Sequence, residues 1–159
     1  MGGRRIAGDR GRAVKQGPAS EVARRIATEC LAVRVRRLGR VVTRIYDAAL
    51  APHGVTTAQL NLLAAIGVAD GANQTALGRI LDVEKSTLSR DLKRMEHLGW
   101  IRSGPASSGR GRSISIAPGG ARLLTQVRPA WEKAQRSAQS QLGRGAFGQL
   151  RRLLRPPGG

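Results

Sequence analysis

Aromatic side chains make up only 3% of this 159-residue chain, and this scarcity limits the folds that it can adopt. Hydrophobic residues still account for 40% of the sequence, so a modest core can form, but it has to be built from Leu, Val, Ile and Ala. Leu and Ala are strong helix formers, and a chain of this length suits one domain. We therefore expect a single, mainly helical domain.

The spacing of apolar residues predicts several helices. Between residues 21 and 50 these residues recur at alternating steps of four and three, which predicts one long amphipathic helix. This apolar seam consists of Leu31, Val35, Leu38, Val42, Ile45 and Ala49. The turn Pro52-His53-Gly54 ends the helix, and Thr56 and Gln59 then have the spacing of a capping box, which predicts a second helix through Gly67.

Two shorter helices follow, over residues 73–81 and 85–98. Asn73 can cap the first, in which Leu77, Ile80 and Leu81 are expected to point inward. Glu84 would be a weak cap for the second. Leu88, Leu92 and Met95 give that second helix a buried face. A helix pair of this kind, joined by a short turn, is typical of a helix-turn-helix.

Strand-forming patterns occur only after these helices. Residues 100–103 and 113–116 alternate in part and flank a loop rich in Gly, Ser and Pro, which predicts a β-hairpin. A helical seam resumes after Pro118 and continues to Leu142, and Pro129 within it predicts a kink or a break. The expected fold is thus mainly α with a small β-hairpin: a winged helix-turn-helix flanked by N- and C-terminal helices.

The formal net charge of +18 indicates a polyanionic partner, either nucleic acid or an anionic membrane. Residues 1–20 are rich in Gly and Arg and lack periodicity, so we expect a disordered basic arm there. Residues 48–69 carry no Lys, Arg, Asp or Glu, but Pro52 and Gly54 interrupt them and several polar residues make them amphipathic. We therefore expect no membrane association and a cytoplasmic protein.

Catalytic and metal-binding patterns are missing from the sequence. Cys30 is the single cysteine, and His53 and His97 stand alone without the spacing of metal ligands. The sequence pattern supports no nucleophile–base pair and no pair of catalytic carboxylates. We therefore expect neither a cofactor nor a metal, and no enzymatic activity.

The polar face of the second short helix is the strongest functional signal. A major groove accepts an α-helix whose side chains reach base edges, and Arg90 has the chemistry to bind guanine bidentately. Arg94 would contact the DNA backbone, while Arg110 and Arg112 on the hairpin suit the negative potential of a minor groove. The expected DNA-binding residues are Lys85, Ser86, Thr87, Ser89, Arg90, Arg94, Arg110 and Arg112.

These segments resemble the MarR family of transcriptional regulators. The resemblance is carried by residues 56–60, 77–81, 85–92 and 98–101, with the run KSTLSRDL at 85–92 as its strongest part. It implies a MarR-type domain over residues 21–155, with a winged-helix core at 55–117 and dimerisation helices at 21–50 and 119–155. It also implies a homodimer that binds a pseudo-palindromic operator in double-stranded DNA, more often as a repressor, and release by a small aromatic ligand.

The chain departs from the family pattern in two places. Ser107-Ser108-Gly109 stand before Arg110, where the family has an Asp that braces this arginine. Ile116-Ala117-Pro118 replace the Leu-Thr that caps the helix after the wing. The charge of the wing is thus retained without the usual brace.

Two alternative functions are also compatible with the sequence. The basic surface would also suit a sequence-neutral, nucleoid-type DNA-binding protein, although the Ser- and Thr-rich helix face favours base reading. Cys30 could instead make the chain a redox-sensing regulator, with Arg34 one turn away to stabilise a thiolate. The simpler interpretation is that Cys30 is a small apolar residue in the helix seam.

Overall fold

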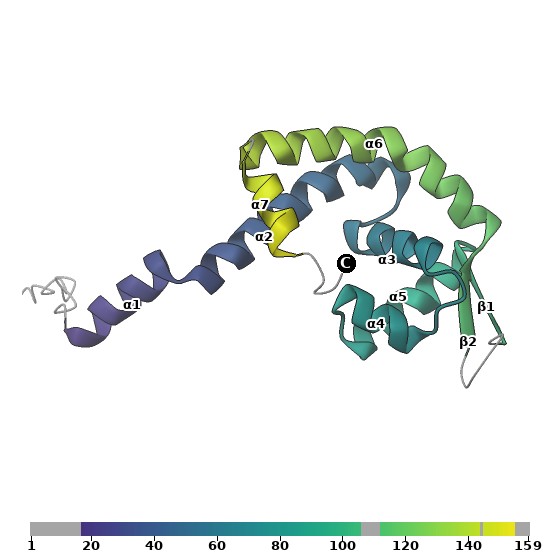
Figure 1. Cartoon of the computed structure of the whole chain (residues 1–159), viewed down its shortest axis with the longest axis horizontal. Coiled ribbons are helices and arrows are strands. Elements are labelled where there is room, and N and C mark those ends of the chain that lie inside the picture. The colour runs from purple at the N-terminus through teal and green to yellow at the C-terminus, as the bar shows by residue number, and fades with distance from the viewer. Residues whose placement is uncertain (1–16, 106–111, 144, 155–159) are drawn as a thin grey trace, which may run out of the picture. The chain divides into compact units, whose positions relative to one another are not determined.

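The structure is a computed structural model that describes residues 17–105, 112–143 and 145–154. Figure 1 shows a mainly helical chain with one β-hairpin, as the sequence predicts. The elements in order are α1 (Pro18–Glu29), α2 (Leu31–Leu50), the 3-10 turn η1 (Ala51–His53), α3 (Thr57–Val68), α4 (Gln74–Leu81), α5 (Lys85–His97), β1 (Ile101–Pro105), β2 (Arg112–Ile116), α6 (Pro118–Leu142) and α7 (Ala146–Leu153). None of the helices in the described ranges is long and apolar enough to cross a membrane.

The chain divides into two compact units, Met1–Gly39 and Arg40–Gly159. The first contains α1 and the start of α2, where the prediction of one helix over residues 21–50 is wrong. Cys30 has an extended backbone (ψ 118°) and separates the two helices. The carbonyl of Thr28 loses its helical partner at this break, and the Arg34 guanidinium donates to it instead, at 3.2 Å from Nε and 2.5 Å from Nη2.

The N-terminal boundary also differs from the prediction. Helix α1 begins at Pro18, so residues 18–20 are helical rather than part of a disordered arm. Proline suits the first helical position because its fixed φ is already helical and its missing N–H is not needed there. The Ser20 hydroxyl adds a hydrogen bond of 2.8 Å to the carbonyl of Gly17. The rest of the predicted arm, residues 1–16, lies outside the described part of the chain.

An aliphatic core holds the second unit together. Helices α3, α4 and α5, both strands and α6 contribute to it, and its fully buried large side chains are Leu50, Leu63, Ile66, Leu77, Leu88, Met95 and Val127. Leu77, Leu88, Leu92 and Met95 point inward as predicted. The prediction for Ile80 is wrong, since its side chain is 57% exposed. The short helix α4 directs Leu77 and Leu81 toward the core, and Ile80 lies on a different side of the helix.

Side-chain caps begin α3 and α4 as the sequence predicts. Thr56 and Gln59 form the capping box of α3, and Asn73 accepts a hydrogen bond of 2.9 Å from the N–H of Ala76. Asp47 on α2 adds a connection that the sequence does not reveal, because its carboxylate accepts from the backbone N–H of Thr57 at 2.8 Å and from its hydroxyl at 2.6 Å. The end of α2 is therefore tied to the start of α3.

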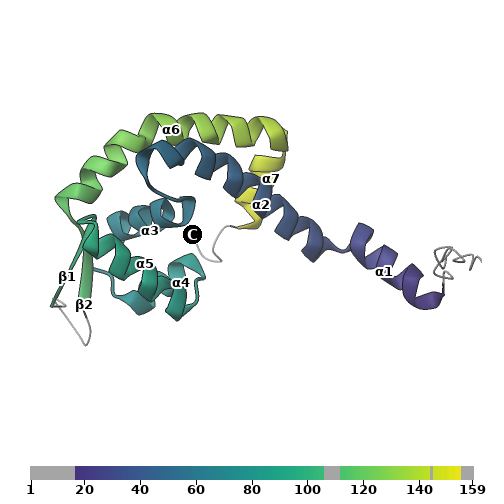
Figure 2. The ribbon, with the colours of Figure 1, turned by 180° about the vertical axis from the view of Figure 1, so that it is seen from behind.

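Helices α2 and α6 are also joined by a polar contact. The Tyr46 hydroxyl donates a hydrogen bond to the side-chain oxygen of Gln135, and burial raises the pKa of Tyr46. Helix α6 runs unbroken past Pro129, so a break is excluded, and its ribbon bends part-way along (Figure 2). Proline removes one backbone hydrogen bond from a helix, which explains how a bend can occur without an interruption.

The hairpin is antiparallel, and its register pairs Ile101 with Ile116 and Ser103 with Ile114. Ile101 and Ile114 are buried in the core, which fixes the base of the hairpin to the helices. The N–H of Ile114 also donates to the carbonyl of Ala72 at 3.0 Å, on the outer edge of β2. The hairpin is therefore held by apolar burial and by a backbone hydrogen bond to the loop between α3 and α4.

Helix α6 begins in close contact with the turn between α5 and β1. A Cβ atom on Gly120 would collide with the carbonyl oxygen of Trp100 and lie 3.1 Å from Leu63 Cδ1, and a Cβ on Gly119 would collide with the carbonyl of Gly99. Backbone atoms cannot move aside as a flexible side chain can. The approach of α6 to the hairpin therefore requires glycine at these two positions.

We predict that Gly120→Ala lowers the free energy of unfolding by about 1–3 kcal/mol, the usual cost of overpacking. Gly78→Ala is the matched control, because a Cβ there lies in ordinary contact, 3.5 Å from its nearest neighbours, within another helix of the same unit. It should leave stability unchanged or raise it by up to about 1 kcal/mol. Urea unfolding followed by circular dichroism measures both, and equal stability of the two variants would contradict the close approach.

Candidate nucleic-acid interface

The turn between α4 and α5 sets the position of the predicted recognition helix. Asp82 ends α4 in the left-handed region (φ 50°), and the N–H of Val83 donates to the carbonyl of Gly78 at 3.1 Å. The side-chain amide of Gln74 then donates to the carbonyl of Lys85 at 3.3 Å. The turn is thus closed onto the middle of α4, and the start of α5 is attached to the start of α4.

Helix α5 has one buried face and one solvent-facing side. Leu88, Leu92 and Met95 are buried, whereas Arg90 and Arg94 are exposed. Lys85 and Ser86 are also exposed, and Thr87 and Ser89 are partly exposed. The structure therefore brings six of the eight predicted DNA-binding residues onto a single helix, with their side chains accessible to a partner.

Two details at the start of α5 refine this surface. Glu84 occupies the N-cap position, as expected, but its side chain forms no capping hydrogen bond. Arg90 Nη2 donates to Thr87 Oγ1 at 3.4 Å, across one turn of the helix. This contact orients the Arg90 guanidinium along the exposed face.

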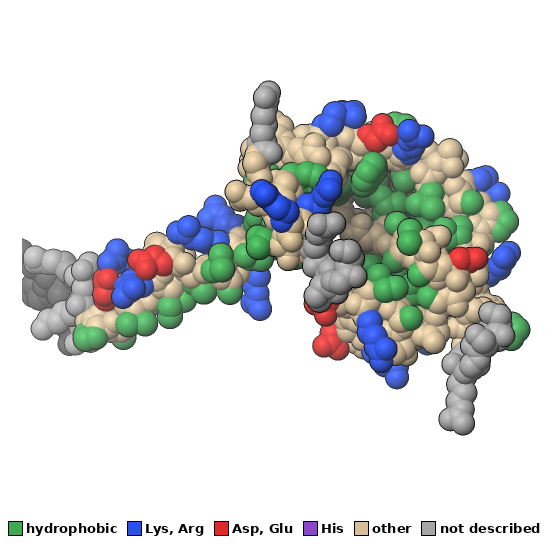
Figure 3. All heavy atoms as spheres, in the orientation of Figure 1, with side chains coloured by type: hydrophobic (Ala, Val, Ile, Leu, Met, Phe, Trp, Pro, Cys, Tyr) green, Lys and Arg blue, Asp and Glu red, His purple; other side chains and the backbone are tan. Residues whose placement is uncertain are grey.

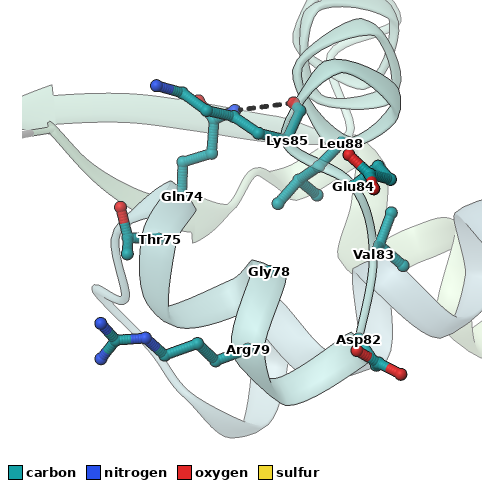
Figure 4. Close-up of a pocket in the computed structure, with 9 residues that line it drawn as sticks. All are labelled: Gln74, Thr75, Gly78, Arg79, Asp82, Val83, Glu84, Lys85 and Leu88. Carbon is teal, nitrogen blue, oxygen red and sulfur yellow. Dashed lines mark hydrogen bonds between the residues drawn. The ribbon is translucent and has the colours of Figure 1, made fainter.

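A cleft of about 520 Å³ lies between α4 and α5. Figure 4 shows the cations of Arg79 and Lys85 pointing to one side of this cleft, with the carboxylates of Asp82 and Glu84 on the other. The opposite charges are thus separated across the turn.

The hairpin lies against the last turns of α5. Arg112 opens β2 with a side chain that is 73% exposed, and its Nη2 is 3.9 Å from Oε1 of Glu96 on α5. The same carboxylate oxygen accepts a hydrogen bond of 3.2 Å from the backbone N–H of Ser103 on β1. A groove of about 400 Å³ between α4, α5 and the hairpin includes Lys93 and Arg112 in its lining.

Glu96 is a residue that the sequence analysis missed. An acid on the otherwise basic last turns of α5, shortly before a predicted strand, was the available signal. Arg110, the other predicted wing residue, falls outside the described residues, as does the rest of the loop over 106–111. The structure therefore places Arg112 beside α5 and does not describe Arg110.

Positive side chains are not confined to this region. On the face drawn in Figure 3, Lys and Arg are spread over several elements rather than gathered in one patch. Net charge alone therefore does not locate a binding surface. The candidate interface is defined by the exposed side of α5 and by its contact with the hairpin.

The structure also describes most of the residues considered for metal and redox chemistry. Within the ranges that the structure describes, no group of three His, Cys, Asp or Glu side chains could hold a metal ion. Cys30 is partly buried between α1 and α2. Arg34, suggested above as its thiolate partner, is instead hydrogen-bonded to the carbonyl of Thr28. A redox role for Cys30 stays an untested hypothesis.

Comparison with known proteins gives consistent results. Residues 53–113 match the MarR family. A cysteine-to-serine variant of MarR from E. coli, solved in complex with operator DNA, is 23% identical and has a TM-score of 0.73, with 82% of this chain and 94% of that chain covered. No curated protein matches the sequence.

The transcriptional regulator MosR from M. tuberculosis is similar at 28% identity and a TM-score of 0.69, with 79% of this chain and 90% of that chain covered. MosR in complex with DNA is 29% identical, has a TM-score of 0.67, and covers 78% of this chain and 90% of its own. The similarity thus extends over most of both chains.

We predict that Asn73→Ala destabilises the second unit by about 1 kcal/mol, because the N–H of Ala76 loses its cap at the start of α4. Asn73→Ser, which restores a capping oxygen, should recover most of this loss. Thermal unfolding of the variants measures the effect. An alanine variant as stable as the serine variant would show that the cap contributes nothing here.

Proposed function

Because the winged-helix domain of this chain belongs to the MarR family, we propose that the chain is a sequence-specific, double-stranded DNA-binding transcriptional regulator that acts as a repressor. The observation that carries this proposal is the exposed side of α5, where hydroxyl and guanidinium groups stand together above a buried apolar row. Hydroxyl groups donate or accept hydrogen bonds at base edges, whereas a purely phosphate-binding surface needs only cations.

The dimensions of α5 suit a major groove. Its 13 residues span about 20 Å, and a B-form major groove accepts one helix of this kind. We assign base contacts to Ser86, Thr87, Ser89 and Arg90, near the start of the helix. Lys85 and Arg94 would position the protein on phosphates, which carry no sequence information themselves.

The hairpin would provide the second contact. Arg112 is exposed and borders the groove between α5 and the wing, so it can reach DNA while α5 lies in the major groove. We propose that Arg112, together with Arg110 in the loop, enters the adjacent minor groove, where negative potential attracts arginine. The DNA complexes solved for E. coli MarR and for MosR support a DNA-binding role for this fold.

We further propose that the chain acts as a homodimer through its N- and C-terminal helices. Large apolar side chains on α1 and α2 are exposed in the single chain, including Ile26 (56%), Leu31 (74%) and Val35 (58%). Exposed apolar side chains that recur along a helix indicate an interaction surface. Repression and release by a small aromatic ligand rest on the family resemblance alone.

Loss of Arg90 tests the base-reading role. Arg90→Ala should weaken binding to the preferred duplex by about 1–3 kcal/mol and relax the preference at one base position in each half-site. Arg128→Ala on α6 is the control for base preference, because it also removes an exposed arginine but lies off α5 and the hairpin; it should leave the preference at every base position unchanged, whatever its effect on the proposed dimer. Selection from a random duplex library, followed by competition binding, measures both effects.

The same experiment separates the proposal from the nucleoid-type alternative. A sequence-neutral protein would bind operator and random duplex with equal affinity and show a steep salt dependence for both. Equal affinity of the wild-type chain for all duplexes would therefore reject the proposed function.

A charge placed in the apolar surface tests the dimer. Leu31→Glu should dissociate the protein into monomers and weaken operator binding, because a buried, unpaired carboxylate is strongly unfavourable in an interface. Ile80→Glu on α4, where the side chain is similarly exposed, should leave the dimer intact. Sedimentation velocity measures the mass, and a Leu31→Glu dimer would contradict this surface.

A further inference from the structure

Glu96 is a carboxylate on a surface proposed to bind a polyanion, and it contacts both strands of the wing. It lies in the last turn of α5 near the cations Lys93 and Arg94. A negative charge there opposes DNA binding by Coulomb repulsion. If Glu96 serves DNA binding, its contacts with the hairpin have to favour binding by more than this repulsion opposes it.

The first contact is with the backbone of β1. Ser103 and Ile114 lie opposite each other in the antiparallel register, and the N–H of each points away from the other strand. The N–H of Ile114 donates to Ala72 on one edge of the hairpin, and the N–H of Ser103 donates to Glu96 on the other. Glu96 thus completes the attachment of the hairpin on the edge that faces α5.

The second contact is with Arg112, the residue with which β2 begins. Its guanidinium lies 3.9 Å from the same carboxylate oxygen, and the two side chains are 73% and 44% exposed. An exposed ion pair of this kind adds little to stability. Its main effect is to restrict where the long Arg112 side chain points.

We propose that Glu96 is the positioning residue of the wing: it anchors β1 to the recognition helix and holds Arg112 in place for its DNA contact. This inference rests on the proposed function, since it concerns how the same surface binds DNA. In this arrangement the brace for a wing arginine comes from α5, and Arg112 and α5 approach the DNA as one unit.

Four proteins test the coupling: the wild type, Glu96→Gln, Arg112→Ala and the double variant. Glu96→Gln keeps an oxygen that can accept from Ser103 but removes the charge that pairs with Arg112. Its affinity for the preferred duplex should fall about threefold to fivefold, and this loss should disappear in the Arg112→Ala background. Asp70→Asn, which removes an exposed carboxylate from the turn between α3 and α4, outside α5, the hairpin and the dimerisation helices, is the matched control and should leave affinity unchanged.

The outcomes distinguish positioning from the other roles that Glu96 could have. Tighter or unchanged binding by Glu96→Gln would show that the carboxylate only repels DNA or does nothing, and would overturn the proposal. An equal loss in both backgrounds would also overturn it, because Glu96 would then act without Arg112. If the wild type prefers no duplex, the proposed function fails, and the same four proteins on random duplex still decide whether Glu96 and Arg112 are coupled.

Hydrogen exchange of the Ser103 amide in the free protein tests the anchor without DNA. Glu96→Ala removes the acceptor, so the amide should exchange faster, whereas the wild type and Glu96→Gln should protect it. Equal exchange in all three proteins would contradict the anchor. Thermal unfolding of the same samples shows that the variants are folded, so that a change in exchange reports on the wing and not on global opening.

Discussion

The burial of one row of side chains on α5 determines which residues of this helix can meet a partner. Leu88, Leu92 and Met95 face the aliphatic core, and each contributes roughly 1.5–3 kcal/mol on burial. Because a helix repeats every 3.6 residues, that row turns Ser86, Arg90 and Arg94 to solvent. The same core holds α3 and α4, so the orientation of the candidate interface depends on apolar packing rather than on its own polar groups.

The wing depends on the same core and on two polar connections. Ile101 and Ile114 are buried at the base of the hairpin, while backbone N–H groups on its two outer edges donate to Ala72 and Glu96. The start of α6 then closes over the turn before β1, where only glycine fits beside the Trp100 carbonyl. The hairpin is therefore fixed to α5, to the start of α6 and to the loop between α3 and α4, which gives it a defined position relative to α5.

Local sequence signals predicted the elements well where the residues themselves carry the interaction. The capping box of Thr56 and Gln59, the cap at Asn73 and the inward row of α5 are all confirmed, because each depends on residues close together in the chain. The kink or break predicted from Pro129 takes the form of a bend in an unbroken α6 (Figure 2). Two expectations are wrong: the helix over residues 21–50 is divided at Cys30, and Ile80 is exposed.

Each of these departures has a physical cause outside the local pattern. The apolar seam from Leu31 to Ala49 lies entirely within α2, so its periodicity carries no information about the backbone at Cys30. Arg34 then satisfies a carbonyl that the division leaves open. The short helix α4 buries only one side, which carries Leu77 and Leu81. Whether Leu81 or Ile80 is on that side depends on how the neighbouring elements pack against α4, and Ile80 is left exposed.

By itself, the sequence determined the element types, the order of a winged helix-turn-helix and the residues that line the polar face of α5. These depend on periodicity, caps and turn residues, which act over a few positions. Only the tertiary structure showed Glu96 against Ser103 and Arg112, Asp47 against Thr57, and α6 against the Trp100 carbonyl. Such contacts join residues on different elements, and their distances are set by how the aliphatic core packs those elements together.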